Sequence, residues 1–114
     1  MASKTIKGIT IEIGGDTSNL GAALKDVDKN IKSTQNELKT IDKLSKLDPN
    51  NLSNYISKQK SLADAVTATK EKLNVLKEAS KQVEEQFKSG KISKQQYEDF
   101  QLEVVQTKEK LKEN

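Results

Sequence analysis

The chain has no cysteine, histidine, tryptophan or arginine, and it has one proline in 114 residues. Without cysteine and histidine, it lacks thiolate and imidazole metal sites, nucleophilic thiols and histidine-based acid–base catalysis. Carboxylates such as Glu84 and Glu85 fall on polar faces, with no spacing that would hold two of them across a cleft. We therefore expect a protein that is not an enzyme and that uses neither a metal nor a cofactor.

Apolar residues are also scarce, because only 32% of the chain is hydrophobic and another 32% is charged. That content is thin for a globular core of this length and favours an elongated shape. No apolar run exceeds a few residues, so we expect neither a signal peptide nor a membrane span.

The sequence pI is about 9.0, which raises the question of nucleic-acid binding. All 20 basic residues are lysine, whereas arginine is the side chain best suited to bidentate contacts with bases and phosphates. The 17 acidic residues are interspersed among the lysines and leave a net charge of only +3. This mixture indicates a solvated helix surface and no specific nucleic-acid partner. A lysine-rich DNA binder is the alternative, and it would show steep salt dependence.

The first pattern in the chain is an alternation of apolar and polar residues at positions 5–13, typical of a strand with one apolar face. Its apolar residues are Ile9, Ile11 and Ile13. No second segment alternates in this way, so we expect the strand to pair with a second copy of the chain or with a sheet in a longer parent protein. An ordinary frayed N-terminus is the alternative.

A first helix is predicted at residues 16–47, because Asp16, Thr17 and Ser18 are good N-caps and Pro49 ends the pattern. Its apolar positions are spaced alternately four and three residues apart, as in the seam of a heptad repeat. They are Leu20, Leu24, Val27, Ile31, Thr34, Leu38 and Ile41.

A second helix is predicted at residues 48–89, with Asp48 as its N-cap and Pro49 in its first position. It would be about 60 Å long. Its seam alternates three and four residues without a slip and passes through Leu52, Tyr55, Gln59, Leu62, Val66, Thr69, Leu73, Leu76, Ser80, Val83 and Phe87. The polar seam residues predict loose packing, because each one forgoes the burial of an aliphatic side chain.

A third helix is predicted at residues 90–114, after a stop at Gly90 and a capping box formed by Ser93 and Gln96. No stop signal follows it, so we expect the natural chain to continue. Short turns between the helices favour antiparallel neighbours. The sequence thus predicts one all-α domain, an elongated antiparallel helical hairpin or coiled coil of three helices preceded by a short N-terminal β-strand or arm at residues 1–15.

Residues 11–31, IEIGGDTSNLGAALKDVDKNI, resemble the N-terminal signature of phage tail tape measure proteins, which has a short strand, a Gly-Asp-Thr/Ser element and an amphipathic helix. Three later stretches resemble the same family in phages and prophages of Gram-positive bacteria. They are IKSTQNELKTIDKLSKLDPNN, LADAVTATKEKLNVLKEASKQVEEQF and SGKISKQQYEDFQLEVVQTKEKL. The resemblance covers essentially the whole chain.

The resemblance implies a structural virion protein that lies inside the tail tube, sets tail length during assembly and leaves the tube at DNA ejection. It implies that the chain is the N-terminal piece of a much longer protein, assembled in the host cytoplasm. The implied partners are copies of the chain itself, tail tube subunits and tail chaperones.

The residues themselves indicate only that strand and seam positions make protein contacts, so a generic coiled-coil adaptor or a secreted helical hairpin is the alternative function. We expect the contacts to use the three strand isoleucines and the aliphatic or aromatic seam positions. The seam positions are Leu20, Leu24, Val27, Ile31, Leu38, Ile41, Leu62, Val66, Leu73, Leu76, Val83 and Phe87.

Overall fold

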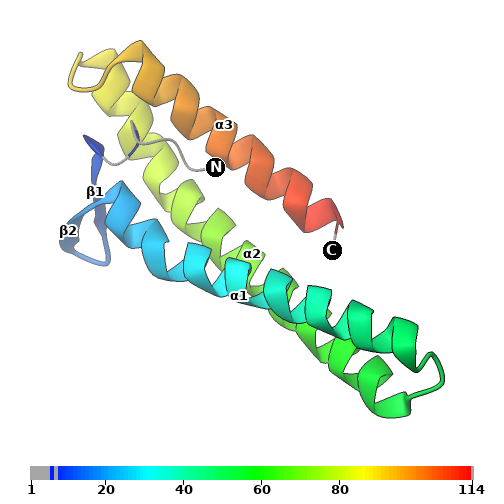
Figure 1. The fold of residues 1–114 in the computed structure, drawn as a ribbon. Coiled ribbons are helices and arrows are strands. Elements are labelled where there is room, and N and C mark those ends of the chain that lie inside the picture. Colours follow the sequence, from blue (N-terminus) through cyan, green and yellow to red (C-terminus); the bar gives the residue numbers. More distant parts are fainter. Residues whose placement is uncertain (1–5, 7, 114) are drawn as a thin grey trace.

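One β-hairpin and three helices make up most of the chain in the computed structural model, which describes residues 6 and 8–113. In chain order they are β1 (Thr10–Ile13), β2 (Asp16–Asn19), α1 (Leu20–Leu47), α2 (Leu52–Lys88) and α3 (Lys94–Glu113). α1 and α2 form a long antiparallel hairpin, and α3 turns back along the C-terminal half of α2 (Figure 1). The body measures 58 × 27 × 19 Å. The predicted elongated hairpin of three helices with a short N-terminal strand is confirmed.

The turn between α1 and α2 occupies residues 48–51. The N–H of Asp48 donates to the carbonyl of Leu44 and ends α1, and the Asn51 side chain accepts a bond from the N–H of Asn54 at the start of α2. The prediction that Asp48 and Pro49 open the second helix is therefore wrong. Residues 48–51 form the turn that reverses the chain, so the N-cap of α2 is Asn51, directly before Leu52.

The turn between α2 and α3 follows the prediction closely. Gly90 has a φ of 79°, which a residue with a side chain rarely adopts, and the N–H of Lys91 donates to the carbonyl of Gln86 at 2.8 Å. These features define a Schellman stop. The predicted capping box is confirmed, because the backbone N–H of Ser93 donates to Oε1 of Gln96 at 2.8 Å while the N–H of Gln96 donates to the Ser93 hydroxyl at 3.1 Å.

The partner of β1 is the segment that directly follows it. β1 and β2 are antiparallel, with Ile13 opposite Asp16, and the two-residue turn between them consists of Gly14 and Gly15 at φ angles of 60° and 86°. Such turns need positive φ at both positions, which glycine adopts without strain. The expectation that the strand finds its partner outside the chain is wrong.

The start of α1 lies four residues after the predicted start. Asp16, Thr17 and Ser18 belong to β2, and Asn19 is the N-cap, since its side chain accepts a 2.8 Å bond from the N–H of Gly21. All four β2 residues are polar or capping types, so they carry no apolar alternation that would identify a strand. Pairing with β1 decides their conformation.

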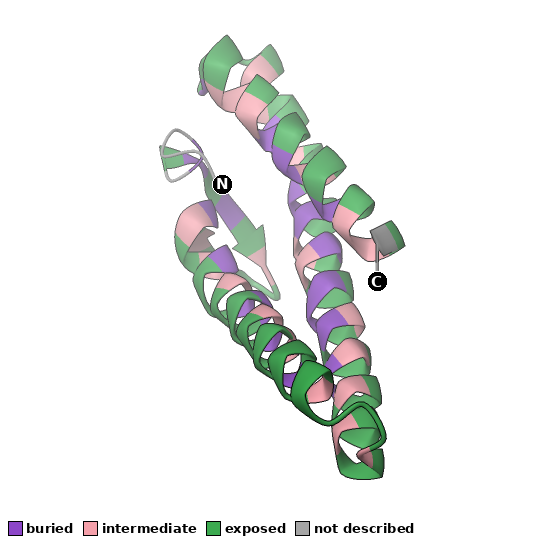
Figure 2. Ribbon diagram, turned by 45° about the vertical axis from the view of Figure 1, so that its right-hand side comes forward, coloured by how far each residue is buried: buried purple, intermediate pink, exposed green. Residues whose placement is uncertain are grey.

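The core lies where the β-hairpin meets the helices. Leu76, Ala79 and Val83 of α2 are fully buried there, and the buried positions of α1 and α2 face each other (Figure 2). The opposite end of the rod, around the turn at residues 48–51, is mostly exposed. We call residues 29–68, which include this turn, the distal half of the hairpin. The other buried members of the core cluster are Ile6, Ile9, Ile11, Leu20, Leu24, Val27, Ile92 and Phe100.

Candidate interaction surfaces

One lysine connects the three helices. Nζ of Lys72 in α2 lies 2.6 Å from Oδ1 of Asp28 in α1 and 2.5 Å from Oε1 of Glu103 in α3. The Glu103 side chain is only 5% exposed and that of Lys72 is 12% exposed, whereas Asp28 is 36% exposed. A carboxylate as buried as Glu103 needs a charged partner. We call these residues the three-helix ion cluster.

The ion cluster keeps Lys72 charged. Burial alone would lower the pKa of Lys72, but its hydrogen bonds to Asp28 and Glu103 and the negative charges of both carboxylates outweigh burial and raise the pKa above the ordinary value of 10.5. The cluster therefore cross-links the three helices through charged hydrogen bonds. A second contact fixes the N-terminal end of α3 on α2. There, Phe87 stacks on Tyr97 with ring centroids 4.3 Å apart.

Sequence reasoning missed the ion cluster, because it selected apolar seam positions. A signal was nevertheless present in α3, where Phe100, Glu103 and Thr107 are spaced three and four residues apart. All three are buried. The apolar pattern of residues 97–111 instead predicts a stripe in which Val104 is half-buried and Lys108 is exposed. That stripe consists of Tyr97, Phe100, Val104, Lys108 and Leu111.

The predicted seam of α1 lies on the buried face of that helix. Six of its seven positions are buried and Leu38 is half-buried. The polar member, Thr34, is satisfied locally, because its hydroxyl donates to the carbonyl of Ile31 at 2.8 Å. These positions pack inside the chain, so any contact they make with a second chain stays a prediction.

The predicted seam of α2 divides into two parts. From residue 69 onward most of its positions are buried, and Phe87 is half-buried beside Tyr97, but Ser80 is exposed. The buried positions are Thr69, Leu73, Leu76 and Val83. In the distal half, Leu62 and Val66 are only half-buried and the positions nearer the turn are exposed.

A different set of residues on α2 faces α1 in the distal half. The buried side chains there are small, namely Ser61, Ala65 and Ala68. Small side chains allow two helices to approach closely, and the bulky seam residues then lie to one side. The hydroxyl of Ser61 donates to Glu37 of α1 across this interface at 3.2 Å.

The isoleucines of the N-terminal segment lie inside the molecule. Ile9 and Ile11 are buried in the core and Ile13 is half-buried. The carbonyl of Ile9 also accepts a 2.7 Å bond from the N–H of Leu20, which extends the pairing with β2 by one residue. The structure thus uses these side chains for its own core.

The outer edge of β1 is covered by two glutamine side chains of α2. Oε1 of Gln82 accepts from the N–H of Glu12 and its Nε2 donates to the carbonyl of the same residue, both at 2.7 Å. Nε2 of Gln86 donates to the carbonyl of Thr10, also at 2.7 Å. The two amides bond to alternate residues of the strand, as a neighbouring strand would. We call this pair the glutamine clip.

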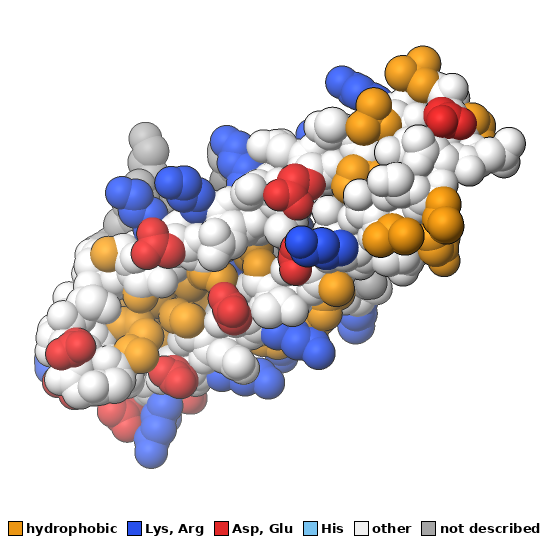
Figure 3. Space-filling model, turned by 90° about the horizontal axis from the view of Figure 1, so that it is seen from below, with side chains coloured by type: hydrophobic (Ala, Val, Ile, Leu, Met, Phe, Trp, Pro, Cys, Tyr) orange, Lys and Arg blue, Asp and Glu red, His pale blue; other side chains and the backbone are white. Residues whose placement is uncertain are grey.

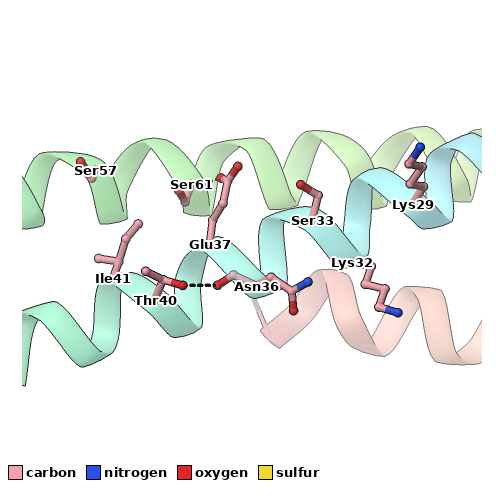
Figure 4. A pocket seen from close by; sticks show the side chains of 9 residues that line it. All are labelled: Lys29, Lys32, Ser33, Asn36, Glu37, Thr40, Ile41, Ser57 and Ser61. Carbon is pink, nitrogen blue, oxygen red and sulfur yellow. Dashed lines mark hydrogen bonds between the residues drawn. The ribbon is translucent and has the colours of Figure 1, made fainter.

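A shallow groove of about 620 Å³ lies between α1 and α2 in the distal half (Figure 4). Lysine, hydroxyl, amide and carboxylate groups line it, together with Ile41, whose side chain points from α1 toward α2. In the close-up, Lys29 and Lys32 point away from each other and do not converge on one point. The groove therefore presents a mixed polar surface. The residues that line it are Lys29, Lys32, Ser33, Asn36, Glu37, Thr40, Ile41, Ser57 and Ser61.

Large hydrophobic side chains are exposed around the turn of the hairpin. Figure 3 shows them at the right-hand end of the rod. They come from the last turns of α1 and the first turns of α2, and their exposed fractions reach 83%. They are Leu44, Leu47, Leu52, Tyr55 and Ile56. Exposed apolar groups gathered at one place are typical of protein contact surfaces.

Among the described residues, every helix is too polar or too short to span a lipid bilayer. The same part of the chain holds no group of three or more acidic side chains arranged to bind a metal ion. Comparison with known protein families, with curated proteins and with solved structures found no match for this chain.

Proposed function

We propose that this chain is a structural assembly segment that works through contacts between its helices and other protein chains. The observation that carries the proposal is the cluster of exposed apolar side chains at the turn of an otherwise strongly charged rod. Burying such a side chain is favourable, by about 1.5 to 3 kcal/mol for each fully covered Leu or Ile. A complex in which a partner covers this end of the rod is therefore stabilised.

We further propose that the parent protein is a phage tail tape measure protein and that this segment is its N-terminal part. The resemblance of residues 11–31 and of the later helical stretches supports this assignment, and so does the elongated helical shape. In this function the segment meets tail tube subunits and tail chaperones during assembly and lies inside the tail of the finished virion.

The test is to locate the segment in particles from a lysate of the phage or prophage that carries its gene. An antibody raised against residues 20–88, or mass spectrometry of purified tails, should find the segment in intact tails and fail to find it in tails that have ejected their DNA. Detection only in the soluble host fraction, with none in tails, would reject the assignment.

A coiled-coil adaptor of another kind is the second candidate, because a hairpin that inserts an apolar end into a partner's groove shows the same exposed side chains. Deletion of residues 1–114 from the phage gene separates the two. A tape measure segment predicts the loss of normal tails, whereas an adaptor outside the virion predicts tails of unchanged length and number.

A further inference from the structure

The distal half of α2 carries a stripe of seven uncharged residues on its outward side. Its positions recur every three or four residues, and most are apolar, in a chain that is 32% charged. Near the turn the side chains are widely exposed, with exposed fractions of 68% for Leu52, 61% for Tyr55 and 59% for Ile56. The stripe consists of Leu52, Tyr55, Ile56, Gln59, Leu62, Ala63 and Val66.

The stripe continues an interface that already exists within the chain. The same heptad spacing leads from Val66 to Thr69, Leu73 and Leu76, which are buried where α2 packs in the core. The seam thus passes without a break from a half that is covered to a half that is bare. A helix laid along the bare half would complete the seam.

The positions of the stripe are symmetric about Gln59. The pairs that lie seven, four and three residues from it on either side are Leu52 with Val66, Tyr55 with Ala63, and Ile56 with Leu62. A helix of the same sequence running in the opposite direction would place each residue beside its counterpart. The largest side chain, Tyr55, would then face the smallest, Ala63, which is the size match that close packing requires.

Gln59 lies at the centre of this symmetry. Its amide has both donor and acceptor atoms, so two copies of it facing each other across a two-fold axis can exchange hydrogen bonds. A single polar residue in an apolar seam is a known means of fixing the register and the number of helices. An unrelated helix would need its own polar group at this point, whereas a second copy supplies one automatically.

We propose that two copies of this chain associate through the distal stripe of α2, antiparallel, with the two-fold axis at Gln59. The proposal rests on the proposed function, since it names one of the protein contacts that the rod makes. The stripe from Leu52 to Val66 spans fifteen residues and about 22 Å. A contact of this length is at the small end of specific interfaces, so the dimer forms with modest affinity and depends on concentration.

Sedimentation velocity across about a hundredfold range of concentration tests the association. The unaltered chain should shift from monomer to dimer. Ile56→Asp, at an exposed position whose replacement leaves the core untouched, should weaken the dimer at least about a hundredfold, because the new carboxylate would be buried between apolar residues. Val105→Asp is the matched control, since Val105 is 55% exposed on α3, outside the stripe, and should leave the dimer unchanged.

Cysteine cross-linking tests the register, and the absence of native cysteine makes single variants unambiguous. Gln59→Cys should form a disulfide-linked dimer under mild oxidation, because the two copies of position 59 meet at the axis. Leu52→Cys should cross-link at least about tenfold more slowly, since its two copies would lie about 21 Å apart, far beyond the reach of a disulfide.

Three outcomes would overturn the inference. They are a chain that stays monomeric at every concentration, a dimer that Val105→Asp weakens as much as Ile56→Asp does, and a Leu52→Cys variant that links as fast as Gln59→Cys. None of them decides whether the segment lies in virion tails, so the proposed function stands or falls by its own test.

Discussion

At the scale of single residues, Lys72 is the position on which the arrangement of the helices depends most. Its ammonium group binds one carboxylate from each neighbouring helix, and one of these, Glu103, is almost completely buried. Apolar residues alone would hold three helices together in several rotations and offsets. A charged group that must bind two carboxylates permits only one of these helix arrangements, and burying the charges costs desolvation free energy.

Replacing Lys72 by methionine should lower the free energy of unfolding by about 3 kcal/mol, because Glu103 would then be buried without a partner. The double variant Lys72→Met/Glu103→Leu should regain most of that loss, since it leaves no unpaired buried charge. Urea denaturation measures both effects. Lys77→Met removes an exposed lysine from the same helix and serves as the control, with little expected change.

The ion cluster also predicts how stability depends on alkaline pH. The pKa of Lys72 is raised in the folded chain, so the unfolded chain loses this proton first as the pH rises. The stability due to Lys72 is fully present below about pH 10.5 and declines as the pH rises through the higher pKa of the folded state.

The difference in unfolding free energy between the unaltered chain and Lys72→Met should therefore be constant from neutral pH to about pH 10 and become smaller above it. Denaturation at a series of pH values measures this difference. A difference that grows with alkaline pH would contradict the raised pKa.

At the scale of elements, the sequence predicted the three helices, the stop at Gly90 and the capping box at Ser93, because local side-chain chemistry decides these features. It failed at β2, where four polar residues form a strand only because β1 and two glycines place them beside it. It also failed to identify the face of α2 that packs on α1 in the distal half. There, the two helices approach closely only where side chains are small, at Ser61, Ala65 and Ala68. A pattern based on bulky apolar residues does not identify these positions.

The glutamine clip explains why β1 is held in the molecule although its sheet has only two strands. Isolated hairpins are marginally stable, and an open strand edge invites pairing with another chain. From α2, Gln82 bonds to both backbone groups of Glu12, and Gln86 bonds to the carbonyl of Thr10. Pairing of this edge with a second copy would first require these three bonds to break.

The double variant Gln82→Ala/Gln86→Ala should raise the hydrogen-exchange rate of the Glu12 amide at least about tenfold, because each lost bond contributes about 1 kcal/mol. Exchange measured by NMR reports this amide directly. The matched control is Gln101→Ala/Gln106→Ala, at two exposed positions of α3. Equal exchange in both double variants would show that the clip does not hold the strand.

At the scale of the whole molecule, the chain is a rod that is thick at one end and thin at the other. The β-hairpin and all three helices share the thick end, and α1 and α2 alone form the thin end (Figure 1). The low apolar content allows this shape, because every residue in a thin rod lies close to the surface and few apolar side chains are needed to fill it. The sequence predicted the elongation for that reason.

Small-angle X-ray scattering at low concentration should give a radius of gyration near the 17.1 Å of the folded structure. A compact globule of this length would give roughly 13 Å. A larger radius that appears as the concentration rises would indicate end-to-end overlap of two rods, whereas a value near that of the globule would contradict the rod shape.

The uneven thickness of the rod has a consequence for how the molecule opens. Leu76 and Val83 at the thick end are fully buried, whereas Leu47 and Leu52 at the thin end are largely exposed. Local unfolding should therefore begin at the turn between α1 and α2 and separate these helices there first, while the thick end stays folded. A protease that acts on the native protein would make its first cut in or near that turn and produce two fragments that stay bound to each other.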